Sequence, residues 1–228
     1  MRNIFTGLAK ITIAIAAIGC GELEISETVQ EERHHPSPKA DSVGESEASS
    51  LDIPYFWQYD NELHPSASCQ NTSVAMVLKY SGWEGVPDDI TREWGKDFAQ
   101  SPESLNYLFN TISTDHFLRA ALTTTTTGTL EGFREAVAGG SAVIVHGYFT
   151  SYGHVLVVNG IDSNGNYVVN DPAGLWSQEF KGGYLYDIDS SAADGDGIVY
   201  EKEAFEVAIS TSDGQSHLPL WYHVLRQF

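Results

Sequence analysis

The chain has 228 residues, which is enough for one ordinary domain and a smaller additional segment. Twelve Lys and Arg residues stand against 31 Asp and Glu residues, and the formal net charge is −19. This charge argues against nucleic-acid binding, which needs a basic face, and against electrostatic docking on anionic lipid. With 42% hydrophobic residues the chain can bury a substantial core.

The N-terminus has the pattern of a targeting segment. Arg2 and Lys10 provide a basic region, and the apolar run at 11–18 is too short to span a bilayer as a stable helix. Small residues then precede Cys20, and this arrangement resembles a bacterial lipobox, in which the cysteine is lipidated and becomes the first mature residue. The alternative is a plain signal peptide that happens to contain a cysteine. We expect an exported protein anchored through Cys20 to the cell envelope, at the outer membrane or the periplasmic face.

Residues 21–50 are predicted to form a disordered acidic tether. The segment holds eight acidic and two basic residues and no aromatic residue, so it should stay extended and solvated. A single domain is expected over 51–228. Because the signal peptide at 1–20 has two bases and no acid, most of the negative charge belongs to this domain.

The first half of the domain is predicted to be mainly helical. A helix over 68–81 has Ser68 as its N-cap and a glycine after its last residue as a stop. Residues 87–110 look helical in two pieces, and a further capped helix is predicted over 129–140. The five threonines at 123–127 favour an edge strand.

The second half is predicted to be mainly strands. Strands are expected at 141–149, 154–161, 166–171 and 220–228. The Asp-Ser-Asn-Gly sequence at 162–165 predicts a turn that joins the two middle strands into a hairpin. A loop over 174–197 and a helix around 201–208 precede the last strand. Helices followed by antiparallel strands indicate an α+β fold.

Cys69 is the candidate nucleophile. The chain has two cysteines, and if Cys20 carries lipid, Cys69 has no partner within the chain, which is unusual in an exported protein. Cys69 falls in the first turn of a predicted helix, where free N–H groups and a partial positive charge lower a thiol pKa. A buried core cysteine is the alternative, and the polar neighbours of Cys69 argue against it.

A thiolate nucleophile needs an imidazole that shares its proton, and His154 is the candidate. It opens an apolar strand, whereas His146 lies within a strand and is interpreted as structural. With a four-residue hairpin loop, Asp171 lies opposite Leu156 and on the face of His154, roughly 7–8 Å away at the backbone, which allows an Asp–His hydrogen bond. A two-residue turn would keep Asp171 and His154 on the same face of the hairpin but widen the distance between them. Asp171 before Pro172 also fits an ordinary turn at the end of a strand.

Acyl transfer through a thiol also needs hydrogen-bond donors for the oxyanion. The backbone N–H of Cys69 is one by its position. The side-chain amide of Gln58, eleven residues upstream, can provide a second.

Four motifs together resemble the C39-like peptidases of the papain-type cysteine peptidase clan. They are IPYFWQYD at 53–60, SCQNTSVAMVLKYSGW at 68–83, GHVLVVNGID at 153–162 and YVVNDP at 167–172. The resemblance implies a papain-like fold, with N-terminal helices packed on an antiparallel sheet. It also implies that Cys69 is the nucleophile and His154 the general base and acid. It further implies that Asp171 orients His154 and that Gln58 is an oxyanion donor.

The motifs depart from the family at one place. Gln70 and Asn71 follow the cysteine where the family often has Gly-Pro, and this departure concerns the shape of the pocket. Founding members of the family cleave double-glycine leader peptides as parts of export transporters. Since no transporter segment is found in this sequence, that substrate is not carried over.

An acidic stretch at 187–203 fits part of a calcium-loop pattern through Asp194, Asp196 and Glu203. Ala192 occupies the first ligand position, where an acid is expected, so we interpret the stretch as an acidic solvated loop, with calcium as the alternative. No cofactor is expected.

The sequence therefore predicts an exported thiol hydrolase, a peptidase or amidase, that cleaves a peptide or amide substrate. A thiol acyltransferase and an inactive papain-like binding lipoprotein are the alternatives. A metal-dependent hydrolase is disfavoured because the sequence has no HExxH and no CxxC. We expect a monomer that meets the membrane through the lipid on Cys20 and binds no nucleic acid.

Overall fold

The computed structural model describes residues 50–185 and 195–228. The predicted signal peptide, Cys20 and nearly all of the predicted tether lie outside the described residues, and so does the segment 186–194. Among the helices that the structure describes, none has the length and apolar character needed to cross a membrane.

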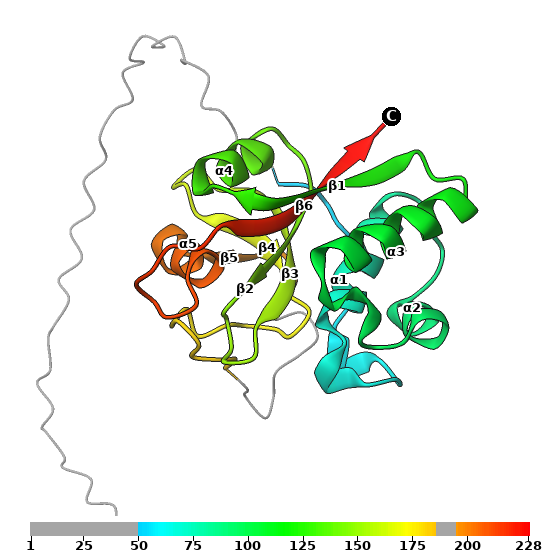
Figure 1. Ribbon diagram of the computed structural model, residues 1–228, viewed down its shortest axis with the longest axis horizontal. Coiled ribbons are helices and arrows are strands. Elements are labelled where there is room, and N and C mark those ends of the chain that lie inside the picture. Colours follow the sequence, from blue (N-terminus) through cyan, green and yellow to red (C-terminus); the bar gives the residue numbers. More distant parts are fainter. Residues whose placement is uncertain (1–49, 186–194) are drawn as a thin grey trace, which may run out of the picture. The chain divides into compact units, whose positions relative to one another are not determined.

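A six-stranded antiparallel sheet lies at the centre of the domain (Figure 1). Its strands are β1 (Ala120–Gly128), β2 (Val143–Gly147), β3 (His154–Ile161), β4 (Tyr167–Asn170), β5 (Ile198–Tyr200) and β6 (Leu220–Gln227). Their spatial order is β1-β6-β2-β3-β4-β5, so the last strand of the chain pairs between β1 and β2. The threonine-rich β1 is at the edge of the sheet, as the sequence predicted.

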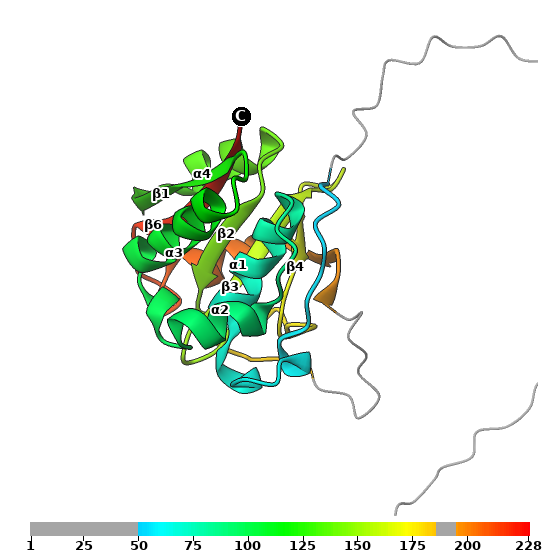
Figure 2. The same ribbon diagram turned by 90° about the vertical axis from the view of Figure 1, so that its right-hand side faces the viewer.

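Helices cover both faces of this sheet. The five α-helices are α1 (Cys69–Tyr80), α2 (Pro87–Trp94), α3 (Pro102–Asp115), α4 (Leu130–Ala138) and α5 (Lys202–Ser210). Three short 3₁₀ helices accompany them, η1 (Gln58–Asp60), η2 (Pro65–Ala67) and η3 (Phe98–Gln100). Figure 1 shows α1, α2 and α3 on one side of the sheet and α4 and α5 on the other, and Figure 2 views the domain from the side of α1–α3.

Alternating strand residues divide the core into two apolar clusters. Ile144 and Val157 pack with α1, α2 and α3, whereas Val145 and Leu156 pack with aromatic residues that include Phe133 of α4. Both sides of β2 and β3 are therefore buried, and these two strands hold their end residues firmly. The predicted α+β class and the papain-like fold are confirmed.

The helix predicted over 68–81 is α1, and its N-terminus differs from the prediction in one detail. Ser68 occupies the N-cap position, but its side chain makes no capping hydrogen bond. The hydroxyl instead accepts from Nδ2 of Asn61 at 2.9 Å. Residues 70–78 are all buried, so tertiary packing holds this helix start in place of a cap.

The hairpin of β3 and β4 determines where its end residues lie, and its register was predicted only in part. A four-residue loop at 162–165 would pair Ile161 with residue 166. In the structure Ile161 pairs instead with Tyr167, so the register near the turn is shifted by one residue. A β-bulge between positions 158 and 160 then restores the predicted register, and Val157 pairs with Asn170. Continuing this register by one residue sets Asp171 opposite Leu156, as predicted.

Candidate active site

Cys69 is the first residue of α1 and its thiol is half-buried. The 3₁₀ helix η2 comes just before it in the chain. The side chain of Asn61 holds the segment before η2 against α1, because its Nδ2 donates to Oγ of Ser68 and, at 3.0 Å, to Oγ1 of Thr72. One turn into α1, the hydroxyl of Ser73 donates to the carbonyl of Val155 at 3.0 Å. This buried bond fixes α1 against the strand that begins with His154.

His154 is the first residue of β3 and is almost fully buried. It follows Gly153, whose φ of +82° lies in the left-handed region. A Cβ at Gly153 would lie 2.6 Å from Nε2 of His146, so any other residue there would be strained and would require the His146 ring to move. The chain can therefore turn sharply into β3 and point His154 toward the helix start.

Cys69, His154 and Asp171 lie together in one connected arrangement. Nε2 of His154 lies 2.8 Å from Oδ1 of Asp171, whose side chain is fully buried. The other ring nitrogen is then available to the Cys69 sulfur. The two side chains line the same cleft and interact electrostatically. The structure thus brings together three of the four site residues that the sequence predicted.

The pKa values of this pair shift in opposite directions. Burial by itself raises the pKa of Cys69, but the charge of His154 and hydrogen bonds to its side chain and to the backbone outweigh burial, and the pKa is lowered. Burial also opposes the charged form of His154, yet Asp171 and Cys69 raise its pKa from 6.5 to about 10. These opposite shifts favour the pair of a thiolate and an imidazolium over the neutral pair.

Gln58 lies in η1 and is buried, next to the segment that leads to Cys69. Its Nε2 donates to the carbonyl of Pro65 at 3.0 Å, and its backbone N–H donates to the carbonyl of Pro172 at 2.8 Å. Nε2 carries a second hydrogen. No hydrogen bond joins Gln58 to Cys69 among the described residues, so its role at the oxyanion stays a prediction.

Gln70 and Asn71, the two positions that depart from the family pattern, have different roles. The Gln70 side chain lies beside the thiol, with Oε1 3.3 Å from the Cys69 sulfur, and Nε2 donates to the carbonyl of Lys96. The Asn71 side chain points to α2 and donates to Oγ1 of Thr91 at 3.0 Å. Gln70 therefore shapes the pocket, whereas Asn71 fastens two helices together.

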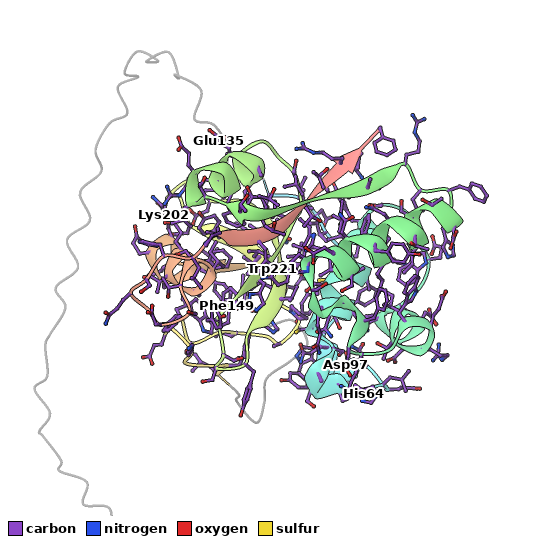
Figure 3. The ribbon with its side chains drawn as sticks, in the orientation of Figure 1. His64, Asp97, Glu135, Phe149, Lys202 and Trp221 are labelled. Atoms are coloured by element: carbon purple, nitrogen blue, oxygen red, sulfur yellow. The ribbon has the colours of Figure 1, made fainter. Side chains whose placement is uncertain are left out.

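The thiol opens into a cleft of about 310 Å³. Its other lining residues come from both sides of the domain: Ser66, Ala67, Gln70, Ala99, Gln100, His146, Tyr152, Gly153, His154, Val155 and Trp221. Trp221, labelled in Figure 3, packs between the sheet and the core of α1–α3. Among the described lining residues there is no Asp, Glu, Lys or Arg.

His146 was interpreted from the sequence as structural, and the structure adds that it lines this cleft. Its ring stacks on Trp221 with centroids 4.7 Å apart and an interplanar angle of 12°. Burial, together with the charge of His154, lowers the pKa of His146 to about 4, so this imidazole is neutral at pH 7. A sequence signal was available, since the predicted strand that contains His146 comes directly before the predicted strand that His154 begins.

Two tyrosines at this site were missed by the sequence analysis. The hydroxyl of Tyr184 donates to Oδ2 of Asp171 at 3.0 Å, and the hydroxyl of Tyr200 donates to the same oxygen at 2.9 Å. Tyr184 lies in the loop after β4 and Tyr200 ends β5, far along the chain from the motifs. No local pattern marks either of them.

The calcium alternative receives no support from the described residues. Asp194 lies outside them, Asp196 is exposed and Glu203 is in the first turn of α5. Within 50–185 and 195–228 no group of three or more His, Cys, Asp or Glu side chains could hold a metal ion.

The fold and the cleft define a protein with the architecture of papain-like cysteine peptidases. The model of the Peptidase_C39 like family matches residues 50–193. The chain therefore belongs to the peptidase C39-like family.

The solved structures that match the chain include two at low sequence identity, and of these the first bears on the fold alone. A protein from Bacillus anthracis described as C39-like peptidase is 15% identical with a TM-score of 0.53, covering 79% of this chain and 98% of its own. A double glycine motif protease from an AMS/PCAT transporter, in complex with the leader peptide, is 14% identical with a TM-score of 0.45, covering 77% and 93%. A search of curated proteins finds no match.

Proposed function

We propose that this protein is a thiol hydrolase, a peptidase or amidase, with Cys69 as its nucleophile. The observation that carries the proposal is the arrangement of Cys69 and His154 on one cleft, with His154 bonded to the buried Asp171. A nucleophile, a base within hydrogen-bond reach and a group that orients the base are the parts that covalent acyl transfer requires. Membership of the peptidase C39-like family supports the same reaction class.

The reaction would proceed through a thioester. The Cys69 thiolate attacks the carbonyl carbon of the amide, and the C–N bond breaks as the His154 imidazolium gives its proton to the leaving amine. His154, now neutral, takes a proton from water as the water oxygen attacks the thioester. The C–S bond then breaks, which releases the acid and restores the Cys69 thiolate beside the His154 imidazolium. The backbone N–H of Cys69 and the Gln58 amide are the proposed donors to the oxyanion.

The cleft indicates the chemistry of the substrate near the scissile bond. Its described lining is uncharged apart from the reacting pair, and one wall is the stack of His146 on Trp221. The neutral imidazole of His146 can accept or donate a hydrogen bond. We infer that the residues flanking the scissile amide are uncharged, because a charged side chain would lose its hydration there without gaining a partner.

The site of action is proposed to lie outside the cytoplasm. The lipobox-like sequence ending in Cys20 and the acidic segment that follows support export and attachment of the domain through a tether. The lipid would hold the enzyme at the cell envelope.

A thiol-directed probe tests the nucleophile. In full-length Cys20→Ala protein Cys69 is the only thiol, and we expect iodoacetamide to label it at pH 7 about tenfold faster than the unfolded chain. His154→Ala should remove the acceleration, whereas the exposed His217→Ala should leave it intact. Labelling of the folded protein no faster than the unfolded chain would contradict the proposal.

The pH dependence follows from the two pKa shifts. The thiolate is lost as pH falls through the lowered pKa of Cys69, and the imidazolium is lost as pH rises through about 10, the pKa of His154. Hydrolysis of an uncharged peptide library should therefore fall at both ends and vanish in Cys69→Ser. A product in which the acyl group is joined to an added amine would identify acyl transfer. A hydrolysis rate that rises only near pH 9, where a free thiol ionises, would contradict the ion pair.

A further inference from the structure

The carboxylate of Asp171 is completely buried and is surrounded by hydrogen-bond donors. Oδ1 accepts from the ring of His154 at 2.8 Å and from the backbone N–H of Ala173 at 2.9 Å. Oδ2 accepts from the hydroxyls of Tyr184 at 3.0 Å and Tyr200 at 2.9 Å. A buried carboxylate is costly unless it is bonded in this way, so four donors share its charge.

The two oxygens of this carboxylate have separate partners. Oδ1 meets His154, and both tyrosine hydroxyls meet Oδ2. Because bonds on both oxygens determine the carboxylate plane, the tyrosines control the direction from which Oδ1 meets the imidazole.

The tyrosines come from two segments that close on Asp171 from different parts of the chain. Tyr184 lies in the loop after β4, where Trp176 and Tyr184 form a β-bridge. Tyr200 ends β5, and its side chain is fully buried. Tyr184 also packs edge-on against the His154 ring, with centroids 5.2 Å apart. It therefore contacts both members of the Asp171–His154 pair.

Both phenols act as donors over the working pH range. Burial, followed by the charge of Asp171, raises the pKa of each tyrosine well above its usual value of 10. The other titratable groups that face the pair are Cys69 from α1, His146 from β2 and Tyr55, whose hydroxyl donates to the Asp171 carbonyl at 2.9 Å.

We propose that Tyr184 and Tyr200 are positioning residues that clamp Asp171 and limit how strongly its carboxylate stabilises the charged form of His154. This inference rests on the proposed function, in which the His154 imidazolium must release the proton of its other ring nitrogen to the leaving amine. A carboxylate that loses a donor concentrates its negative charge and holds the neighbouring imidazolium proton more strongly. The clamp thereby keeps His154 oriented and still able to act as an acid.

The two tyrosines differ in how cleanly they can be tested. The hydroxyl of Tyr200 also accepts from the backbone N–H of Trp176 at 3.0 Å, so Tyr200→Phe leaves a buried donor without its partner. Tyr184→Phe keeps the aromatic ring against His154 and removes the hydroxyl. Tyr184 is therefore the primary site and Tyr200 the second.

The experiment compares Tyr184→Phe with a matched control in the full chain. Tyr107→Phe on α3 removes a hydroxyl from an exposed tyrosine outside the cleft. We expect Tyr184→Phe to lower kcat about tenfold, the effect of losing one charge-assisted hydrogen bond, with KM within about twofold. The alkaline limb of the rate profile should move to higher pH, and Tyr200→Phe should move it in the same direction.

Unchanged kcat and an alkaline limb that stays or moves to lower pH in Tyr184→Phe would overturn the clamp. The ring NMR signals of His154 provide a readout that does not depend on turnover, and its pKa should rise in Tyr184→Phe but not in Tyr107→Phe. If the parent protein neither labels rapidly nor hydrolyses amides, the proposed function fails, and the His154 titration still decides whether the tyrosines act on Asp171.

Discussion

Single residues at the start of β3 control how the cleft is built. Gly153 adopts a left-handed φ, and its missing side chain leaves room for the ring of His146. Two histidines can therefore lie next to each other, one neutral and one charged, because their surroundings differ. Asp171 bonds to His154, whereas His146 has an indole beside it.

Gly153→Ala is expected to separate backbone strain from damage to the site. The left-handed φ costs an alanine about 1–2 kcal/mol of stability, and the new Cβ would also displace the ring of His146. Gly140→Ala is a matched control, since Gly140 has a φ of +76° and no atom within 4 Å of its would-be Cβ. Urea unfolding should show a loss in both variants, but kcat/KM should fall, about tenfold or more, only in Gly153→Ala. Equal activity in the two would contradict the steric argument.

At the scale of elements, the β3–β4 hairpin and its bulge place Asn170 where it bonds to segments that are distant in the chain. Asn170, the last residue of β4, is fully buried, and its Oδ1 accepts from Nδ2 of Asn159 at 2.6 Å and from the N–H of Gly197 at 2.9 Å. Its Nδ2 donates to the carbonyl of Ile53 at 2.8 Å. One side chain therefore joins the bulged strand, the start of β5 and the N-terminal segment, directly before Asp171.

Asn170→Ala is predicted to destabilise the domain by about 2–3 kcal/mol, because it leaves buried donors and an acceptor without partners. Since Asp171 follows immediately, activity should fall as well. Asn164→Ala in the exposed turn is the control, with a change within about 0.5 kcal/mol. Urea denaturation measures both, and equal stability of the two variants would show that this network has no role.

At the scale of the whole molecule, the acidic domain and the predicted lipid anchor are expected to act as separable parts. In a bacterial host that processes lipoproteins, the full chain should fractionate with membranes and Cys20→Ala should not. Cys69→Ala is the control, because it removes the other cysteine and should leave the fractionation unchanged. Retention of Cys20→Ala in the membrane fraction would contradict anchoring through that cysteine.

Local sequence signals predicted much of the fold and part of the candidate site. The start of α1 at Cys69, the threonine-rich edge strand and the hairpin before Asp171 depend on helix periodicity, turn residues and strand parity, which act over a few positions. The one-residue shift of register at the turn was missed, and so was the bulge that reverses it, because a bulge has no distinctive residue pattern here. The bulge restores the predicted register before Asp171, so the hydrogen bond predicted between Asp171 and His154 is present.

The sequence by itself determined which local elements carry the candidate residues: Cys69 at a helix start, His154 at a strand start and Asp171 at a hairpin end. The tertiary structure alone decided that β6 inserts beside β2, that Trp221 stacks on His146, and that Tyr184 and Tyr200 close on Asp171. The physical reason is that short-range signals depend on neighbouring residues, whereas these contacts join segments far apart in the chain and depend on how whole elements pack.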